Sequence, residues 1–181
     1  MHSLFYSASP FTVWFTGLSG AGKSTLAEKL QSTLSDKGRI AMILDGDVIR
    51  KGISQDLGFD ASSRAENLRR IAHMAKLLNR QGVDVICATI SPLTSDRLLA
   101  QSIIGSSYIE IYVSTPLETC EQRDPKGLYK LARAGKIKEF TGISAPYDPP
   151  LDAININTVT TTASEAIQNI IRALDPFLNG V

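Results

Sequence analysis

Short apolar runs alternate along the chain with stretches in which apolar residues recur every three or four positions. Runs of this length predict β-strands, and we expect strands over residues 11–16, 39–44, 83–90, 108–114 and 153–157. Between the runs, Leu68, Ile71 and Ala75 share one face of a predicted helix, and residues 167–178 repeat that spacing. The pattern therefore predicts alternating strands and helices.

Residues typical of helix ends support this alternation. They are the pairs Ser63…Glu66 and Thr115…Glu118 at capping-box spacing, Pro116 in a first turn, and Gly38 and Gly82 after last turns. The run 86–90 is apolar at successive positions, as expected of a central strand covered on both faces. The predicted fold class is a three-layer α/β domain with a central, mostly parallel five-stranded sheet.

Length and composition narrow the possibilities. The 181 residues fit a single domain, 1–181, and 19 basic against 18 acidic residues argue against a broadly basic nucleic-acid-binding protein. Two scattered cysteines, Cys87 and Cys120, fit a reducing cytoplasm rather than a disulfide framework. We expect no membrane span, and the first ten residues lack the features of a secretory signal and are interpreted as a short lead-in.

The segment 17–24, Gly-Leu-Ser-Gly-Ala-Gly-Lys-Ser, matches the pattern G-x-x-x-x-G-K-[ST] between a predicted strand and a predicted helix. Its glycines let backbone N–H groups approach phosphate oxygens. Lys23 can reach the terminal phosphates, and the Ser24 hydroxyl can bind Mg²⁺. A nucleoside triphosphate site is therefore predicted. The guanine-reading N-K-x-D element is absent from the sequence, which argues against a GTPase.

A kinase of this class also needs a carboxylate for the acceptor hydroxyl and cations for an anionic acceptor. Asp45 and Asp47 follow the second predicted strand, at the sheet edge where such folds bind ligands. One carboxylate can face the metal and the other the acceptor, although Asp-Gly-Asp alone is more often a turn. Arg64 and Asn67 share one side of the next helix, a side that Arg69 does not share.

The chain resembles the adenylylsulfate kinase family of P-loop kinases, which phosphorylate the 3′-hydroxyl of adenosine 5′-phosphosulfate (APS) to form PAPS. The resemblance extends over about residues 11–150, and its most specific motifs are 120–130 (CEQRDPKGLYK) and 140–143 (FTGI). Further matching segments are 17–25, 44–47, 56–59, 66–70 and 90–92. It implies an ATP- and Mg²⁺-dependent kinase of the P-loop NTPase type.

The resemblance also implies roles for individual residues. For the acceptor, Asp47 acts on the ribose hydroxyl, and the residues expected to bind APS are Arg50, Phe59, Arg64, Asn67, Ile90, Ser91, Lys126 and Phe140, with the two phenylalanines sandwiching the adenine. For ATP, the expected contacts are Gly17, Ser19, Gly20, Ala21, Gly22, Lys23, Ser24 and Thr25, with Arg123 and Arg133 from a mobile lid over about 123–142. Ser24 and Asp45 are the expected metal ligands.

Several alternatives remain open. Ser91 corresponds to a family position described as a phosphoserine intermediate, but direct in-line transfer needs no covalent step, and we favour Ser91 as a pocket residue. Val48 replaces a usual Asn and Leu93 a usual aromatic residue. Because of Val48, a related kinase with a drifted acceptor is a second hypothesis. A nucleotide-binding regulator without transfer activity is a third. The resemblance further suggests a cytoplasmic homodimer.

Overall fold

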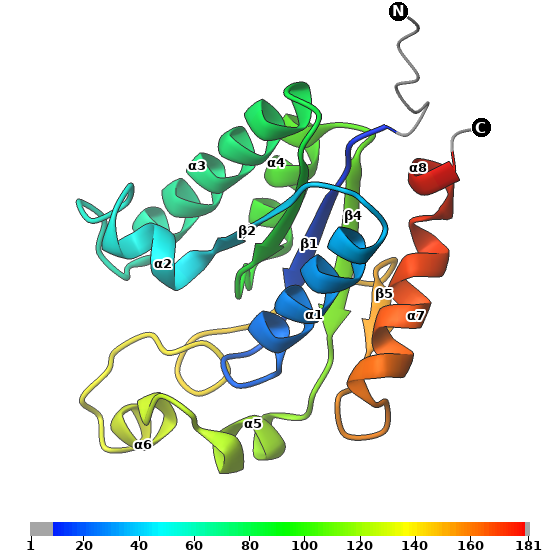
Figure 1. Ribbon diagram of the computed structural model, residues 1–181. Helices are drawn as coiled ribbons and strands as arrows, with labels where there is room; N and C mark the ends of the chain where they lie inside the picture. The colour runs from blue at the N-terminus through cyan, green and yellow to red at the C-terminus, as the bar shows by residue number, and fades with distance from the viewer. Residues whose placement is uncertain (1–8, 180–181) are drawn as a thin grey trace, which may run out of the picture.

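The computed structural model describes residues 9–179, so the predicted lead-in lies mostly outside the described residues. Its centre is a parallel sheet with the strand order β2-β3-β1-β4-β5 (Figure 1). The strands are β1 (Thr12–Thr16), β2 (Ala41–Asp45), β3 (Asp84–Ala88), β4 (Tyr108–Val113) and β5 (Ile154–Ile156). The helices are α1 (Lys23–Asp36), α2 (Gly46–Lys51), α3 (Ala61–Arg80), α4 (Thr94–Ile104), α5 (Leu117–Arg123), α6 (Leu128–Arg133), α7 (Ala163–Ala173) and α8 (Asp175–Asn179).

The five predicted strands and the predicted fold class are confirmed. Neighbouring strands all pair in parallel, and each strand lies within or beside the apolar run that predicted it. The central strands β1 and β3 are buried at every position, whereas the edge strand β2 is only partly buried. Strands covered on both faces cannot alternate apolar with polar residues, which explains the continuous runs in the sequence.

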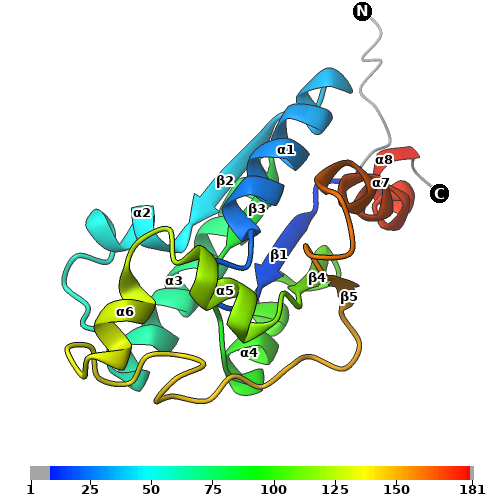
Figure 2. The same ribbon diagram turned by 90° about the horizontal axis from the view of Figure 1, so that it is seen from below.

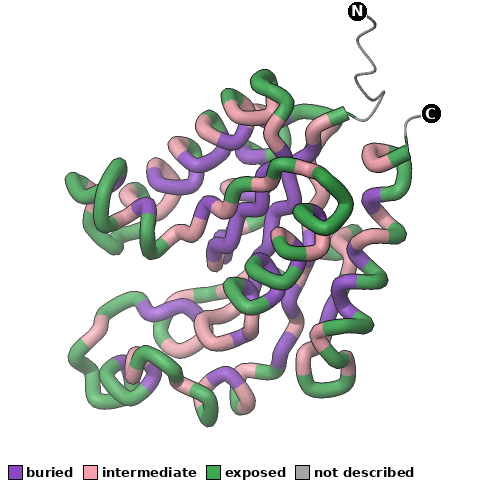
Figure 3. The backbone as a smooth tube through the Cα atoms, in the orientation of Figure 1, coloured by how far each residue is buried: buried purple, intermediate pink, exposed green. Residues whose placement is uncertain are grey.

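Two apolar layers cover the sheet. Val13 and Phe15 pack with the buried faces of α1 and α7, while Trp14, between them, packs with α3 and α4 on the opposite face. Figure 2 shows α1 and α7 on one side of the sheet and α3 and α4 on the other. Buried positions follow the strands through the centre, and the outward helix surfaces are exposed (Figure 3). The core thus fixes the strand ends at which the side chains discussed below are displayed.

The predicted helix start at Ser63 is wrong by one turn. Helix α3 is capped by Asp60, whose carboxylate accepts a hydrogen bond from the Ser63 N–H at 2.9 Å. Because the aspartate already satisfies this free N–H group, Ser63 lies inside the first turn. Glu66, the expected partner in the capping box, instead pairs with Arg69 and Arg70.

The predicted capping box at Thr115 is also wrong, because the Thr115 hydroxyl donates to the Ala21 carbonyl at 2.9 Å rather than capping α5. Pro116 stands just before α5, as its N-cap, instead of inside the first turn. A capping box does occur at Thr162 and Glu165, where α7 begins. The expected helix ends are confirmed: Gly38 and Gly82 follow α1 and α3 with φ of 74° and 81°.

The cation-rich stretch 123–138 forms a loop-and-helix excursion between β4 and β5, as the sequence predicts. It includes α6 and returns along the lower side of the molecule in Figure 1, below the carboxyl ends of the strands. No helix in the described part of the chain is both long and apolar enough to cross a membrane.

Candidate active site

A cavity of about 1080 Å³ opens at the carboxyl ends of β1, β2 and β3. Most of the residues proposed from the sequence line it: Ser19, Gly20, Gly22, Lys23, Ser24, Thr25, Asp45, Asp47, Arg50, Phe59, Arg64, Asn67, Ile90, Ser91, Arg123, Lys126 and Phe140. Gly17, Ala21 and Arg133 are not among its lining residues. The tertiary structure therefore gathers segments from α1, α2 and α3, residues 89–92 after the carboxyl end of β3, and the 123–142 segment around one space.

The glycine-rich loop connects β1 to α1 in a conformation that requires glycine. Gly17 has a φ of +143°, and a Cβ atom there would lie 2.5 Å from the carbonyl oxygen of Val113. Gly20 has a φ of +75°, and its Cβ would approach the Cys120 carbonyl oxygen to 3.0 Å. The loop lies so close to neighbouring backbone that side chains at these positions would displace it. Gly17 thus shapes the loop although it does not line the cavity.

We expect Gly17→Ala to destabilise the protein by more than about 1 kcal/mol, because alanine is strained at positive φ and meets a fixed carbonyl. Nucleotide affinity should fall with it, since the loop must shift. Thermal unfolding and ATP titration measure the two effects. Gly38→Ala is the matched control, because Gly38 also has positive φ but its Cβ would meet nothing within 4 Å. Equal losses in both variants would mean that conformation, rather than the close approach, explains the glycine.

Lys23 begins α1 and folds back over the loop. Its Nζ donates to the carbonyl oxygens of Gly17 and Leu18 at 2.8 and 2.7 Å. Burial lowers the pKa of Lys23 to about 8, against a partial opposing effect of nearby acidic groups that include Asp47. An anionic phosphate beside the ammonium would favour its charged form. The site therefore holds a desolvated cation directed at the place where a phosphate chain would enter.

Ser24 and Asp45 form a pair of oxygen ligands at the loop. The Ser24 hydroxyl donates to one carboxylate oxygen of Asp45 at 3.0 Å. The other oxygen caps α2 by accepting from the N–H groups of Asp47 and Val48 at 2.9 and 3.3 Å. Mg²⁺ prefers such hard oxygen ligands and is usually held by one or two side chains together with substrate phosphates. The residues present therefore fit a magnesium ion bound with a nucleotide.

Asp47 lies in the first turn of α2 and forms an ion pair with Lys126 of the cation-rich segment. Both side chains are more than half exposed, so the pair contributes little to stability. It does place a carboxylate and a lysine from distant parts of the sequence on the same side of the cavity. A substrate hydroxyl entering there would meet both groups.

The two phenylalanines both line the cavity but in different settings. Phe59 is 70% exposed, and the Arg50 guanidinium carbon lies 4.9 Å from the centre of its ring. Phe140 is buried and packs edge-to-face against Tyr129, with ring centroids 4.9 Å apart. Phe59 is thus open for stacking on a planar ligand, while Phe140 is held by its neighbour.

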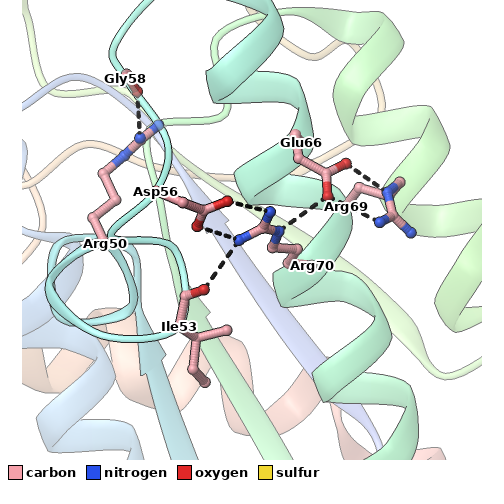
Figure 4. A network of polar contacts seen from close by, with 7 residues as sticks. All are labelled: Arg50, Ile53, Asp56, Gly58, Glu66, Arg69 and Arg70. Atoms are coloured by element: carbon pink, nitrogen blue, oxygen red, sulfur yellow. Dashed lines mark hydrogen bonds and ion pairs between the residues drawn. The ribbon is translucent and has the colours of Figure 1, made fainter.

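The loop that carries Phe59 is held to α3 by Arg70 (Figure 4). Arg70 makes two hydrogen bonds to the Asp56 carboxylate at 2.7 and 2.8 Å and one to the Ile53 carbonyl at 3.0 Å. These bonds also lower the pKa of Asp56. In the same view, Arg50 donates to the Gly58 carbonyl at 2.7 Å. Arg70 therefore supports the site without lining the cavity.

Arg64 joins α3 to the residues that directly follow the cation-rich segment. Its Nε donates to the Phe59 carbonyl at 2.7 Å, and its terminal nitrogens donate to the Glu139 carbonyl and the Thr141 hydroxyl. Asn67, one turn later on the same face, is buried and lines the cavity. Within the described residues its Oδ1 atom has no hydrogen-bond partner, a costly state for a buried polar atom unless a ligand or water pairs with it.

Ser91 lies in the segment that follows the carboxyl end of β3. Its φ of +38° is unusual for a residue other than glycine. Its side chain is buried, and its Oγ accepts a hydrogen bond from the Trp14 indole at 3.1 Å. The preceding carbonyl, of Ile90, accepts from Thr16 at 2.7 Å. The Ser91 hydroxyl is therefore already engaged as an acceptor, in a backbone turn that neighbouring groups hold in place.

The two arginines expected beside ATP differ in position. Arg123 lines the cavity, and its guanidinium donates to the Thr158 hydroxyl at 2.9 Å beside the carbonyls of Gly20 and Ala21. Arg133 instead donates two hydrogen bonds to the Glu121 carboxylate, at 2.8 and 2.9 Å. In this arrangement the Arg133 guanidinium is directed to α5, and its contact with ATP stays a prediction.

A threonine-rich stretch before α7 completes the cavity and was missed in the sequence. Thr158, Thr161 and Thr162 line the cavity with Ala163. Thr158 lies against the glycine-rich loop, since a Cβ at Gly22 would be 3.3 Å from its methyl group. The run Thr160-Thr161-Thr162 and the following capping box were the available signals, but neither indicates which cavity the loop will border.

A family model and several known proteins are similar to this chain. The family model described as adenylylsulphate kinase matches residues 9–157. An adenylyl-sulfate kinase of Paraburkholderia xenovorans is 48% identical over 90% of this chain and 91% of its own length. An APS kinase of Mycobacterium tuberculosis, solved in complex with AMPPNP and APS, superposes with a TM-score of 0.89 at 45% identity, over 93% of this chain and 99% of the other. A hexameric APS kinase from Thiobacillus denitrificans matches with a TM-score of 0.69 at 31% identity, over 93% of this chain and 29% of the other.

Proposed function

Because this chain belongs to the adenylylsulfate kinase family, we propose that it transfers the terminal phosphate of ATP to the 3′-hydroxyl of APS, giving PAPS and ADP. The observation that supports this most directly is the shared cavity. One space is lined by the phosphate loop, by Asp45 and Asp47, and by the arginines, lysine and aromatic rings that an adenine nucleotide acceptor requires.

In the proposed reaction, the bond between the terminal phosphorus of ATP and its bridging oxygen breaks, and a bond from that phosphorus to the 3′-oxygen of APS forms. Asp47 takes the hydroxyl proton, and Lys23 stabilises the charge on the transferring group. Ser24 and Asp45 would hold Mg²⁺, which supplies charge neutralisation on the phosphates. We assign direct transfer, because in-line transfer to the ribose hydroxyl needs no covalent intermediate, and we give Ser91 a place in the pocket wall, where its hydroxyl accepts from Trp14.

We assign the acceptor side to Arg50, Phe59, Arg64, Asn67, Ile90, Lys126 and Phe140, and the ATP side to the phosphate loop with Arg123. The lid is the segment 123–142, whose residues Lys126 and Phe140 line the cavity. We also propose that the kinase requires Mg²⁺, is cytoplasmic and forms a homodimer. Two buried free thiols, Cys87 and Cys120, fit a reducing compartment.

The departure at Val48 does not argue for another acceptor. Val48 is 66% exposed and is not among the residues that line the cavity. The valine at this position therefore removes no polar group from the cavity lining. Leu93 likewise precedes α4 outside that lining set. ADP release measured with APS, adenosine monophosphate and adenosine as acceptors tests the proposal. Turnover that does not prefer APS, or an absence of turnover with all three, would contradict it.

We expect Arg64→Ala to weaken APS binding far more than ATP binding. Losing a charged, partly buried hydrogen-bonding partner typically costs about 2–5 kcal/mol, or roughly thirtyfold to several thousandfold in affinity. Arg69→Ala is a matched control, since Arg69 lies on the same helix but pairs only with Glu66 on the surface. Titration of both nucleotides against both variants measures the effect. Equal weakening of ATP and APS would instead assign Arg64 to the lid, through its bonds to Glu139 and Thr141.

A further inference from the structure

Arg97 is a buried arginine that the proposed reaction does not use. It lies on α4, is 3% exposed, and is not among the residues that line the cavity. A guanidinium has five N–H donors, and the two terminal nitrogens of Arg97 donate four hydrogen bonds here. The acceptors are the Ser91 carbonyl at 2.9 Å, the Pro92 carbonyl at 3.1 Å, Thr94 Oγ1 at 3.2 Å and the Asp148 carbonyl at 2.7 Å. The Nε atom forms an ion pair with Glu110 Oε1 at 2.7 Å.

These partners come from separate parts of the chain. Ser91 and Pro92 belong to the segment after β3 that lines the cavity, while Glu110 is in β4. Asp148 follows the lid, and two further hydrogen bonds tie it to Pro92 and Thr94. Its N–H donates to the Pro92 carbonyl at 2.8 Å, and its carboxylate accepts from the Thr94 N–H at 3.2 Å. Arg97 therefore holds the base of the lid against one wall of the cavity.

A second arm of the same network reaches the phosphate loop. The guanidinium carbon of Arg97 lies 5.9 Å from the centre of the Tyr147 ring. The Tyr147 hydroxyl hydrogen-bonds the Thr16 hydroxyl at 2.9 Å, and Thr16 in turn donates to the Ile90 carbonyl at 2.7 Å. Thr16 is the last residue of β1, directly before Gly17. The network thus joins the end of β1, the segment that follows β3 and the residues that follow the lid.

The wall that Arg97 supports has a backbone that does not hold its shape unaided. Ser91 has a positive φ, and such conformations persist when surrounding contacts fix them. The Ser91 carbonyl accepts from Arg97 and Thr16, and its hydroxyl accepts from Trp14. If Arg97 lost part of its donor set, Ile90 and Ser91 would be free to leave the position in which they face the cavity.

We propose that Arg97 is a positioning residue for the acceptor: it fixes the Ile90–Ser91–Pro92 wall and the base of the lid, and so sets the affinity for APS without touching it. This rests on the proposed function, because it takes APS as the acceptor on that side of the cavity. Glu110 contributes by pairing with the guanidinium. A buried arginine left without this partner would be strongly unfavourable.

The test is Arg97→Lys, which keeps the charge but offers three donors in place of five. We expect the KM for APS to rise by about tenfold, equivalent to about 1.4 kcal/mol, while the KM for ATP changes by less than about twofold. Arg39→Lys is the matched control. Arg39 also pairs with a buried carboxylate, Asp84, but at the opposite end of β3, so its replacement should lower the melting temperature without changing either KM.

Tyr147→Phe keeps the test decisive if Arg97→Lys does not fold. It removes only the hydroxyl that contacts Thr16, and we expect the KM for APS to rise about threefold with the KM for ATP unchanged. A folded Arg97→Lys whose ratio of the two KM values equals that of the wild type would overturn the proposal, as would an unchanged KM for APS in Tyr147→Phe if the lysine variant is unfolded. Wild-type turnover of APS, measured in parallel, separates these outcomes from a failure of the proposed function.

Discussion

Lys23→Ala should abolish most of the turnover while leaving the fold intact. Lys23 is the desolvated cation of the phosphate loop, and stabilisation of developing charge in a water-poor site by one such group is worth about a hundredfold or more in rate. The side chain contributes little to folding, because burying its charge is unfavourable and its bonds are to two loop carbonyls. Steady-state turnover and a thermal melt of the purified variant measure both expectations.

Lys29→Ala is the matched control for that substitution. Lys29 lies on the same helix, α1, and makes a single exposed contact to Ser164 at 3.3 Å away from the cavity lining. Its turnover should equal that of the wild type. If Lys23→Ala retained more than about a tenth of wild-type turnover, a loss below about 1.4 kcal/mol, the assignment of the phosphate loop would be wrong.

Asp47→Asn should lower turnover by about 10²–10⁴-fold while APS still binds, because the amide keeps the shape of the side chain but cannot accept the ribose proton. The substitution also breaks the ion pair with Lys126, but that pair is exposed and its loss should hardly change stability. Turnover by ADP release and APS binding by calorimetry are the two measurements required.

Asp45→Asn provides the comparison that separates the two carboxylates. Asparagine is as good a helix cap as aspartate, so α2 should keep its start, but the oxygen that faces Ser24 loses its charge. The expected result is a higher Mg²⁺ requirement with turnover restored at saturating metal. Identical Mg²⁺ dependence in Asp45→Asn and Asp47→Asn would sink this division of roles.

The local character of some signals explains why they could be interpreted without coordinates. The phosphate loop is contiguous in the sequence, and its glycines, lysine and serine each act through backbone conformation or position along one turn. The five apolar runs likewise predict the five strands of the sheet. The two central strands, β1 and β3, are buried on both faces and so have no polar side to display. Helix starts were less certain: Asp60 and Ser63 are both good caps, and only the folded loop decides between them.

The alternating α/β order, the phosphate loop and the resemblance to adenylylsulfate kinases could all be predicted without coordinates, since each rests on neighbouring residues or on contiguous motifs. Which distant groups meet depends on the folded chain. It directed Arg133 to Glu121 and brought Thr158 to the loop. It also enclosed Arg97 among four hydrogen-bond acceptors and one carboxylate, which are spread from Ser91 to Asp148 along the chain. The physical reason is that a buried polar side chain must find partners wherever packing places them, and no local spacing specifies those partners.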